Sequence, residues 1–165
     1  MKSIKSLLLL AALLLAAPVV AQVEIDQKAL IGAWTLKKDP MTITLTFKKG
    51  GKLEQKIVIS AAEMQGSIRT TMKGEWTSAA DSICVKVDPE SVQAKYIGSN
   101  KQIGDMIEQS FTANRDKLMQ QAGVTDQVLR QVVIADDILI FSQQIPAIPG
   151  MTEAKEERVV MTREK

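Results

Sequence analysis

The sequence predicts a mainly β protein, an up-and-down antiparallel barrel of about eight strands with a helical insertion at about 88–123. Three observations support this fold class. Several short segments between residues 30 and 87 alternate apolar and polar residues, which is the period of a strand with one buried face. A glycine pair at Gly50–Gly51 and polar turns separate these segments. Between residues 101 and 123 the apolar residues instead recur at helical spacing.

The strands of the first half are expected at 30–37, 41–47, 52–59, 67–76 and 82–87. The second is the clearest, because Ile43, Leu45 and Phe47 alternate with threonines. Gly50–Gly51 follows this strand, and a pair of glycines supplies the positive φ angles that a tight hairpin needs. This half is therefore expected to be a meander of antiparallel strands with one apolar face.

The pattern changes at Asp88–Pro89, where the aspartate can cap a helix and the proline can occupy its first position. We expect 88–123 to be mostly helical, with an interruption at Gly98 and a C-terminal cap at Gly123. The apolar spacing predicts that the longest helical stretch begins at Lys101.

Strands are expected to resume at 128–134, 138–143 and 156–162. Asp136–Asp137 lies in the turn between the first two of these strands. Thr125 could instead cap a short helix ahead of Val128, which leaves that boundary open. If 128–143 paired elsewhere, the sheet would be a sandwich and the argument for an enclosed interior would fail.

Residues 1–21 have the features of a secretory signal peptide. Lys2 and Lys5 precede an apolar run, and this run ends in the small-residue cleavage site before Gln22. The run is shorter than the roughly 18 apolar residues that a spanning helix needs. We therefore expect cleavage near Ala21, export to the periplasm or the medium, and a single mature domain at 22–165 without a membrane span.

The composition excludes several functions for the mature chain. The whole chain carries 21 basic and 19 acidic groups, and removing Lys2 and Lys5 leaves a neutral domain without the basic surface that nucleic acid requires. With one cysteine and no histidine, neither a histidine-based catalytic pair nor a Cys-rich zinc site is possible. The carboxylates of Asp136–Asp137 and Glu156–Glu157 point apart if they lie on strands, and Asp105 and Glu108 are expected on the surface. We expect no enzyme, no metal and no cofactor.

Two short motifs suggest a family. Gly32-Ala33-Trp34 lies on the first expected strand, and Gly74-Glu75-Trp76 ends the fourth. With the strand Thr44-Leu45-Thr46-Phe47 between them, this layout resembles the small secreted lipocalin-like domains common in Bacteroidetes, many of which have no assigned function. The resemblance implies a lipocalin-like barrel in which Trp34 closes one end and Gly32 allows close packing. Both roles are structural.

The candidate binding site is the inward face of the barrel, which would hold a small apolar ligand. Its expected members are Ile43, Leu45, Phe47, Ile57, Ile59, Ile68, Met72, Trp76, Ile83, Val85, Ile140, Val159 and Met161. The alternative is a filled core without a cavity, because aliphatic side chains of this size fill small barrels well.

The helical insertion has three possible roles. Its apolar residues include Met106, Phe111, Leu118 and Met119, and methionine adapts to irregular surfaces. The helix could cover the barrel mouth, bind a partner protein, or simply pack on the outside of the barrel.

Cys84 is expected on the outer face with Ser82 and Lys86, where no histidine can activate its thiol.

The sequence thus predicts a secreted, non-enzymatic protein that binds a small apolar ligand in its barrel. The alternative is a protein-interaction module that uses the helical insertion or the barrel exterior and has a filled barrel without a ligand. An apolar void of roughly 300 Å³ or more favours the first. A contiguous exposed apolar patch of several hundred Å² favours the second.

Overall fold

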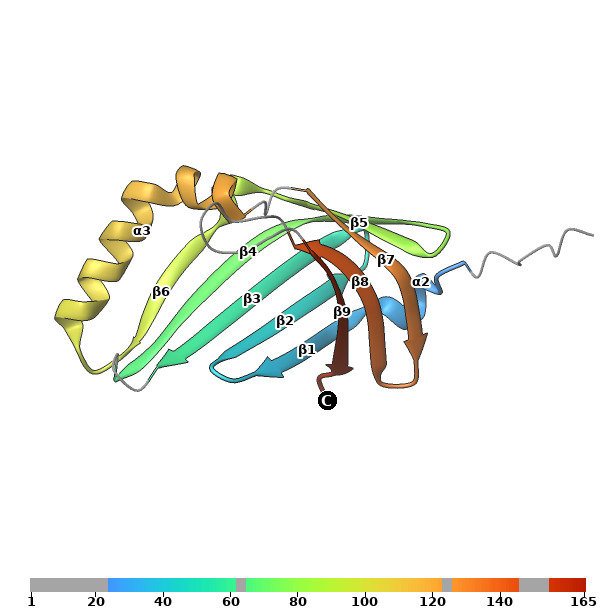
Figure 1. The fold of residues 1–165 in the computed structure, drawn as a ribbon, viewed down its shortest axis with the longest axis horizontal. Coiled ribbons are helices and arrows are strands. Elements are labelled where there is room, and N and C mark those ends of the chain that lie inside the picture. The colour runs from blue at the N-terminus through green and yellow to red at the C-terminus, as the bar shows by residue number, and fades with distance from the viewer. Residues whose placement is uncertain (1–23, 62–64, 123–125, 146–154) are drawn as a thin grey trace, which may run out of the picture.

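The computed structural model describes residues 24–61, 65–122, 126–145 and 155–165, with side chains except at 61, 117–122 and 145. Within these residues it has nine β-strands, a short helix, a 3-10 turn and one long helix (Figure 1). In chain order the elements are α2 Gln27–Leu30, β1 Gly32–Lys38, β2 Met41–Lys48, β3 Lys52–Ala61, β4 Gly66–Ala79, β5 Ser82–Val87, η2 Pro89–Ser91, β6 Gln93–Gly98, α3 Lys101–Ala122, β7 Asp126–Ala135, β8 Ile138–Ile145 and β9 Lys155–Arg163. The predicted signal peptide and Gly123 lie outside the described residues.

Eight of the described strands form a closed antiparallel barrel. The order around it is β1-β2-β3-β4-β5-β7-β8-β9, and β9 pairs again with β1. This closure confirms the fold class and excludes the sandwich, because β7 pairs with β5 and β8. The strand that begins at Asp126 also excludes a short helix ahead of Val128.

Strand β6 was not predicted, and it corrects the expected helical span of 88–123. As predicted, Asp88 caps a turn, and its side chain accepts a hydrogen bond of 3.0 Å from the Glu90 backbone N–H. The turn stops after Ser91, whose hydroxyl accepts a hydrogen bond from the Lys73 backbone N–H on β4. The chain then pairs with the part of β4 that β5 leaves uncovered, and the long helix begins only at Lys101.

The barrel has two ends that differ in their connections. At one end lie α2 and the β2–β3, β4–β5 and β7–β8 turns, and we call this the closed end. The turn glycines Gly50 and Gly51 have φ of 75° and 70°, as predicted, and Asp136 has φ of 50°. The opposite end, where β1 turns into β2, is the mouth. Strands β3, β4 and β6 extend beyond the mouth, and α3 lies beside them (Figure 1).

Trp34 closes the closed end, as the resemblance implied. Its side chain is fully buried, and the indole N–H donates a 2.8 Å hydrogen bond to the Leu30 carbonyl on α2. The Arg163 guanidinium lies 4.2 Å from the centre of the Trp34 ring and donates to the carbonyls of Ala29 and Ile31. Gly32 has φ of 137°, and a Cβ there would approach the guanidinium to 2.6 Å. Glycine is therefore required for this packing.

Helix α3 packs on β6, the strand at the edge of the extension. Gly104 lies against the Tyr96 ring, where an added Cβ would come within 3.0 Å. Glu108 accepts a hydrogen bond from the Tyr96 backbone N–H at 3.3 Å, so the helix caps an edge strand. Phe111, which is half-buried, packs against the main core. The described part of the chain contains no helix that is both long and apolar enough to cross a membrane.

Candidate functional site

The barrel encloses a cavity of about 220 Å³ that is partly open to solvent. Every strand of the barrel wall except β4 contributes to it among the described residues. Its lining consists of Leu36, Lys38, Met41, Ile43, Leu45, Leu53, Gln55, Val85, Gln127, Leu129, Phe141, Gln143, Glu157, Val159 and Met161. The barrel is therefore not completely filled by its own side chains.

The cavity has an apolar floor and a polar rim. Leu36, Leu53, Leu129, Phe141 and Val159 each lie two positions from a polar lining residue on the same strand. Because side chains two positions apart share a face of a strand, both sets point inward. The polar members lie nearer the mouth, since they are closer to the strand ends that meet there. We call these five residues the polar rim: Lys38, Gln55, Gln127, Gln143 and Glu157.

The polar rim combines one ion pair with three amides. The Lys38 ammonium lies 3.5 Å from a Glu157 carboxylate oxygen, and the two side chains are 68% and 34% exposed. Glu157 lies directly opposite Gln143 in the β8–β9 register. All three glutamines are half-buried, and no hydrogen bond joins their side-chain amides to another part of the described chain. The rim therefore has no net charge, and its three glutamine amides have no hydrogen-bond partner among the residues that the structure describes.

Apart from Ile140, the predicted site residues divide into three groups. Five of them line the cavity, namely Ile43, Leu45, Val85, Val159 and Met161. Four are buried in the core without lining it: Phe47, Met72, Trp76 and Ile83. The Phe47 and Trp76 rings meet edge to face at 5.7 Å. The other three belong to neither group: Ile57 is partly buried against the core opposite Ile43, Ile59 is 38% exposed opposite Met41 at the mouth, and Ile68 lies opposite Ile59 on β4.

The inward placement of Ile140 was wrong. Its neighbours Leu139 and Phe141 are buried and point into the barrel. Ile140 therefore faces outward, opposite Val133 on β7 and Val160 on β9, which are 51% and 48% exposed. The segment 138–141 is apolar at every position, so its pattern does not reveal which residues face the core.

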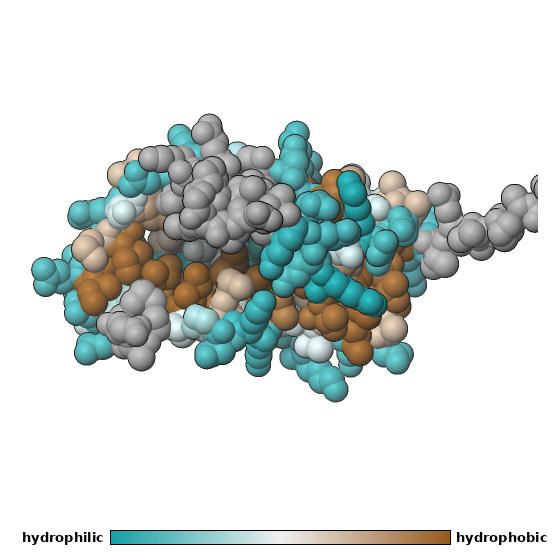
Figure 2. All heavy atoms as spheres, in the orientation of Figure 1, coloured by the Kyte–Doolittle hydropathy of each residue, from teal (hydrophilic) through white to brown (hydrophobic). Residues whose placement is uncertain are grey.

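Exposed apolar side chains gather outside the barrel as well. Figure 2 shows hydrophobic surface beside α3 and β6, and again over the outer sides of β7, β8 and β9. The second area includes Val133, Ile138 and Val160. Cys84 also faces outward, as predicted, and its thiol is free and exposed.

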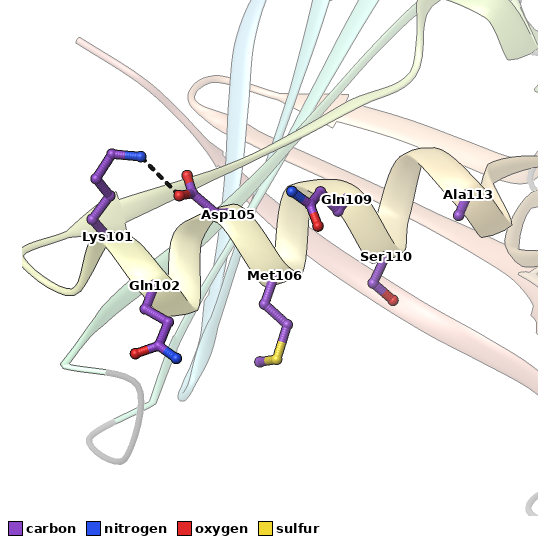
Figure 3. A pocket seen from close by; sticks show the side chains of 7 residues that line it. All are labelled: Lys101, Gln102, Asp105, Met106, Gln109, Ser110 and Ala113. Atoms are coloured by element: carbon purple, nitrogen blue, oxygen red, sulfur yellow. Dashed lines mark hydrogen bonds and ion pairs between the residues drawn. The ribbon is translucent and has the colours of Figure 1, made fainter.

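The outward side of α3 is polar. Figure 3 shows seven side chains along it, with an ion pair of 2.7 Å between Lys101 and Asp105. They line a shallow hollow of about 890 Å³. All of its lining residues that the structure describes belong to α3. Met106 is 63% exposed there and is its one large apolar side chain among the described residues. The predicted Leu118 and Met119 side chains lie outside the described set.

A third hollow lies outside the closed end, between α2 and the β2–β3 turn, with a volume of about 870 Å³. Its lining includes Lys28, Lys49 and Trp76. It is an open surface feature. Trp76 is buried beside it, and the Trp76 indole N–H donates to the Lys48 carbonyl.

The groups with clearly shifted pKa values belong to surface ion pairs away from the cavity. A hydrogen bond from the Lys48 ammonium lowers the pKa of Glu54, and one from Lys52 lowers the pKa of Glu75. The hydrogen bond to Asp105 raises the pKa of Lys101. In the part of the chain that the structure describes, no cluster of three acidic, cysteine or histidine side chains could hold a metal ion.

Comparisons with known proteins yield no match, either among protein-family models or among curated protein sequences. The barrel, its cavity and the polar rim are the features of the described chain that indicate a function.

Proposed function

We propose that this chain, after export, binds a small and mainly apolar molecule inside its barrel. The observation that carries the proposal is the cavity of about 220 Å³, whose floor is apolar and whose rim is polar. Such a site binds by removing apolar surface from water while the polar groups at its edge orient the ligand. The mechanism needs no chemical step.

The cavity volume limits the ligand size. Ligand pockets usually measure about 300–1,000 Å³. This cavity, at about 220 Å³, is below the size expected from the sequence for a binding barrel, so its ligand is smaller than most. An apolar cavity of about 150 Å³ in another protein takes up benzene, which has six carbon atoms. By the same ratio, a cavity of about 220 Å³ accepts about nine non-hydrogen atoms. A linear chain of about eight carbons with a small head group satisfies this limit.

The protein-interaction alternative has less support. It assigned partner binding to the helical insertion or to the barrel exterior, where Val133, Ile138 and Val160 are exposed, together with a filled barrel. The outward side of α3 is mostly polar, and Phe111 packs toward the core. The barrel also contains unfilled volume.

A series of 1-alkanols tests the proposal. Calorimetric titration of the mature chain 22–165 with the C4 to C12 alcohols should show saturable binding. Each added CH₂ should strengthen it about fourfold, from roughly 0.8 kcal/mol per buried methylene. The gain should stop near eight carbons, where the cavity is full. Absence of saturable binding, or a gain that continues unbroken to twelve carbons, would contradict binding in this cavity.

A further inference from the structure

We infer that the ligand carries an uncharged head group that both donates and accepts hydrogen bonds, such as a primary amide or an alcohol. This inference rests on the proposed function and specifies the chemical class of the ligand. It depends on the polar rim: Lys38, Gln55, Gln127, Gln143 and Glu157.

The three glutamines favour a head group that can donate and accept. Each side-chain amide offers a carbonyl acceptor and two N–H donors. Gln127 and Gln143 lie on the paired strands β7 and β8, and Gln55 lies on β3, so they line the cavity from two separate parts of the barrel wall. None is hydrogen-bonded to another described residue. An amide or hydroxyl head at this level can therefore replace the water that these groups would otherwise bind.

A ligand without a head group would lose part of this stabilisation. Its chain would still remove apolar surface of Leu45, Leu53 and Leu129 from water. At the rim it would displace water without offering a partner to the glutamine amides, which carries a free-energy cost. The rim therefore selects an amphipathic ligand over a pure hydrocarbon.

The charged pair of the rim disfavours an ionic head group. Lys38 already has a partner in Glu157, at 3.5 Å, so the rim carries no net charge. A carboxylate head would gain attraction to Lys38 and meet repulsion from Glu157, and an ammonium head would meet the reverse. Either ion would also lose hydration at the half-enclosed rim without a free counter-charge.

Four ligands with the same eight-carbon chain separate these head groups. At pH 7 and constant ionic strength, octanamide and 1-octanol should each bind the mature chain at least fivefold more tightly than octanoate or octylammonium. An octanoate or octylammonium affinity equal to that of octanamide would overturn the inference while leaving binding in the barrel intact. No binding by any of the four would overturn the proposed function and, with it, this inference.

A pair of neighbouring variants locates the effect at the rim. Gln143 lines the cavity, whereas Gln144 is exposed. Gln143→Met retains side-chain length but removes the amide, and should weaken octanamide binding about threefold to fivefold. Gln144→Met should leave the affinity unchanged. Equal effects of the two variants, with both retaining the far-UV circular dichroism of the parent protein, would contradict a role for the rim.

Discussion

Replacing Trp34 with alanine is expected to lower the free energy of unfolding by about 3–5 kcal/mol, the range for buried tryptophan truncations. The ring is fully buried at the closed end, where it contacts α2 through its hydrogen bond to the Leu30 carbonyl. Its removal would create a cavity and also expose the Arg163 guanidinium, which loses its aromatic partner at 4.2 Å. Urea unfolding followed by circular dichroism measures the change.

Two further variants show how the effect arises. Trp34→Phe retains most of the apolar volume but loses the indole N–H, so it should cost less than the alanine variant. Val160→Ala, on the exposed outer face of β9, should change stability by no more than about 0.5 kcal/mol. A loss below about 1 kcal/mol for Trp34→Ala would show that this end of the barrel does not depend on the tryptophan.

Filling the cavity is expected to abolish most ligand binding. Val159 lines the cavity and pairs with Phe141 in the β8–β9 register, so Val159→Phe would add a second aromatic ring to the cavity lining. The added ring brings about four carbons, and excluding a similar length of ligand chain should cost roughly 3 kcal/mol, or about 100-fold in affinity. Calorimetric titration with 1-octanol measures this loss.

Val160→Phe is the matched control for this substitution. Val160 is the next residue on β9 but is 48% exposed on the outer face, so its replacement should leave the 1-octanol affinity unchanged. The free energy of unfolding of Val159→Phe shows whether the barrel contains a cavity or a filled core. Overpacking a filled core costs typically 1–3 kcal/mol, whereas a ring that enters existing volume should cost less than about 1 kcal/mol. Full 1-octanol affinity in Val159→Phe would contradict the cavity as the binding site.

Most of the barrel could be predicted from the sequence because several of its strands alternate apolar and polar residues. The segment 41–47 is the clearest case, and β2 covers it. Strand β6 was missed because Asp88–Pro89 does start a helical turn, and the local signal does not show that it stops at Ser91. Strand β6 forms because it pairs with the part of β4 that β5 does not cover. This pairing joins residues far apart in the sequence, such as Ile68 and Tyr96. Sequence periodicity does not contain that information.

The site was only partly predictable for a related reason. We selected the apolar residues at alternate positions along each strand. Five of those selected line the cavity: Ile43, Leu45, Val85, Val159 and Met161. The same selection omits inward polar residues, although Gln55 lies between Leu53 and Ile57 on one face of β3. The position of Gln55 in this alternation was the sequence feature from which the polar rim could have been predicted. Gln127 and Gln143 lie near strand ends, where the boundaries were uncertain.

The most direct test of binding inside the barrel is a ¹H–¹⁵N correlation spectrum of the mature chain during titration with octanamide. We expect saturable shifts concentrated on the strands that line the cavity, at Leu45, Gln55, Leu129, Phe141 and Val159 among others. The outward side of α3, including Gln102 and Met106, should remain unchanged. Shifts confined to α3 or to the outer faces of β7, β8 and β9, or no saturable shifts at all, would contradict the proposed site.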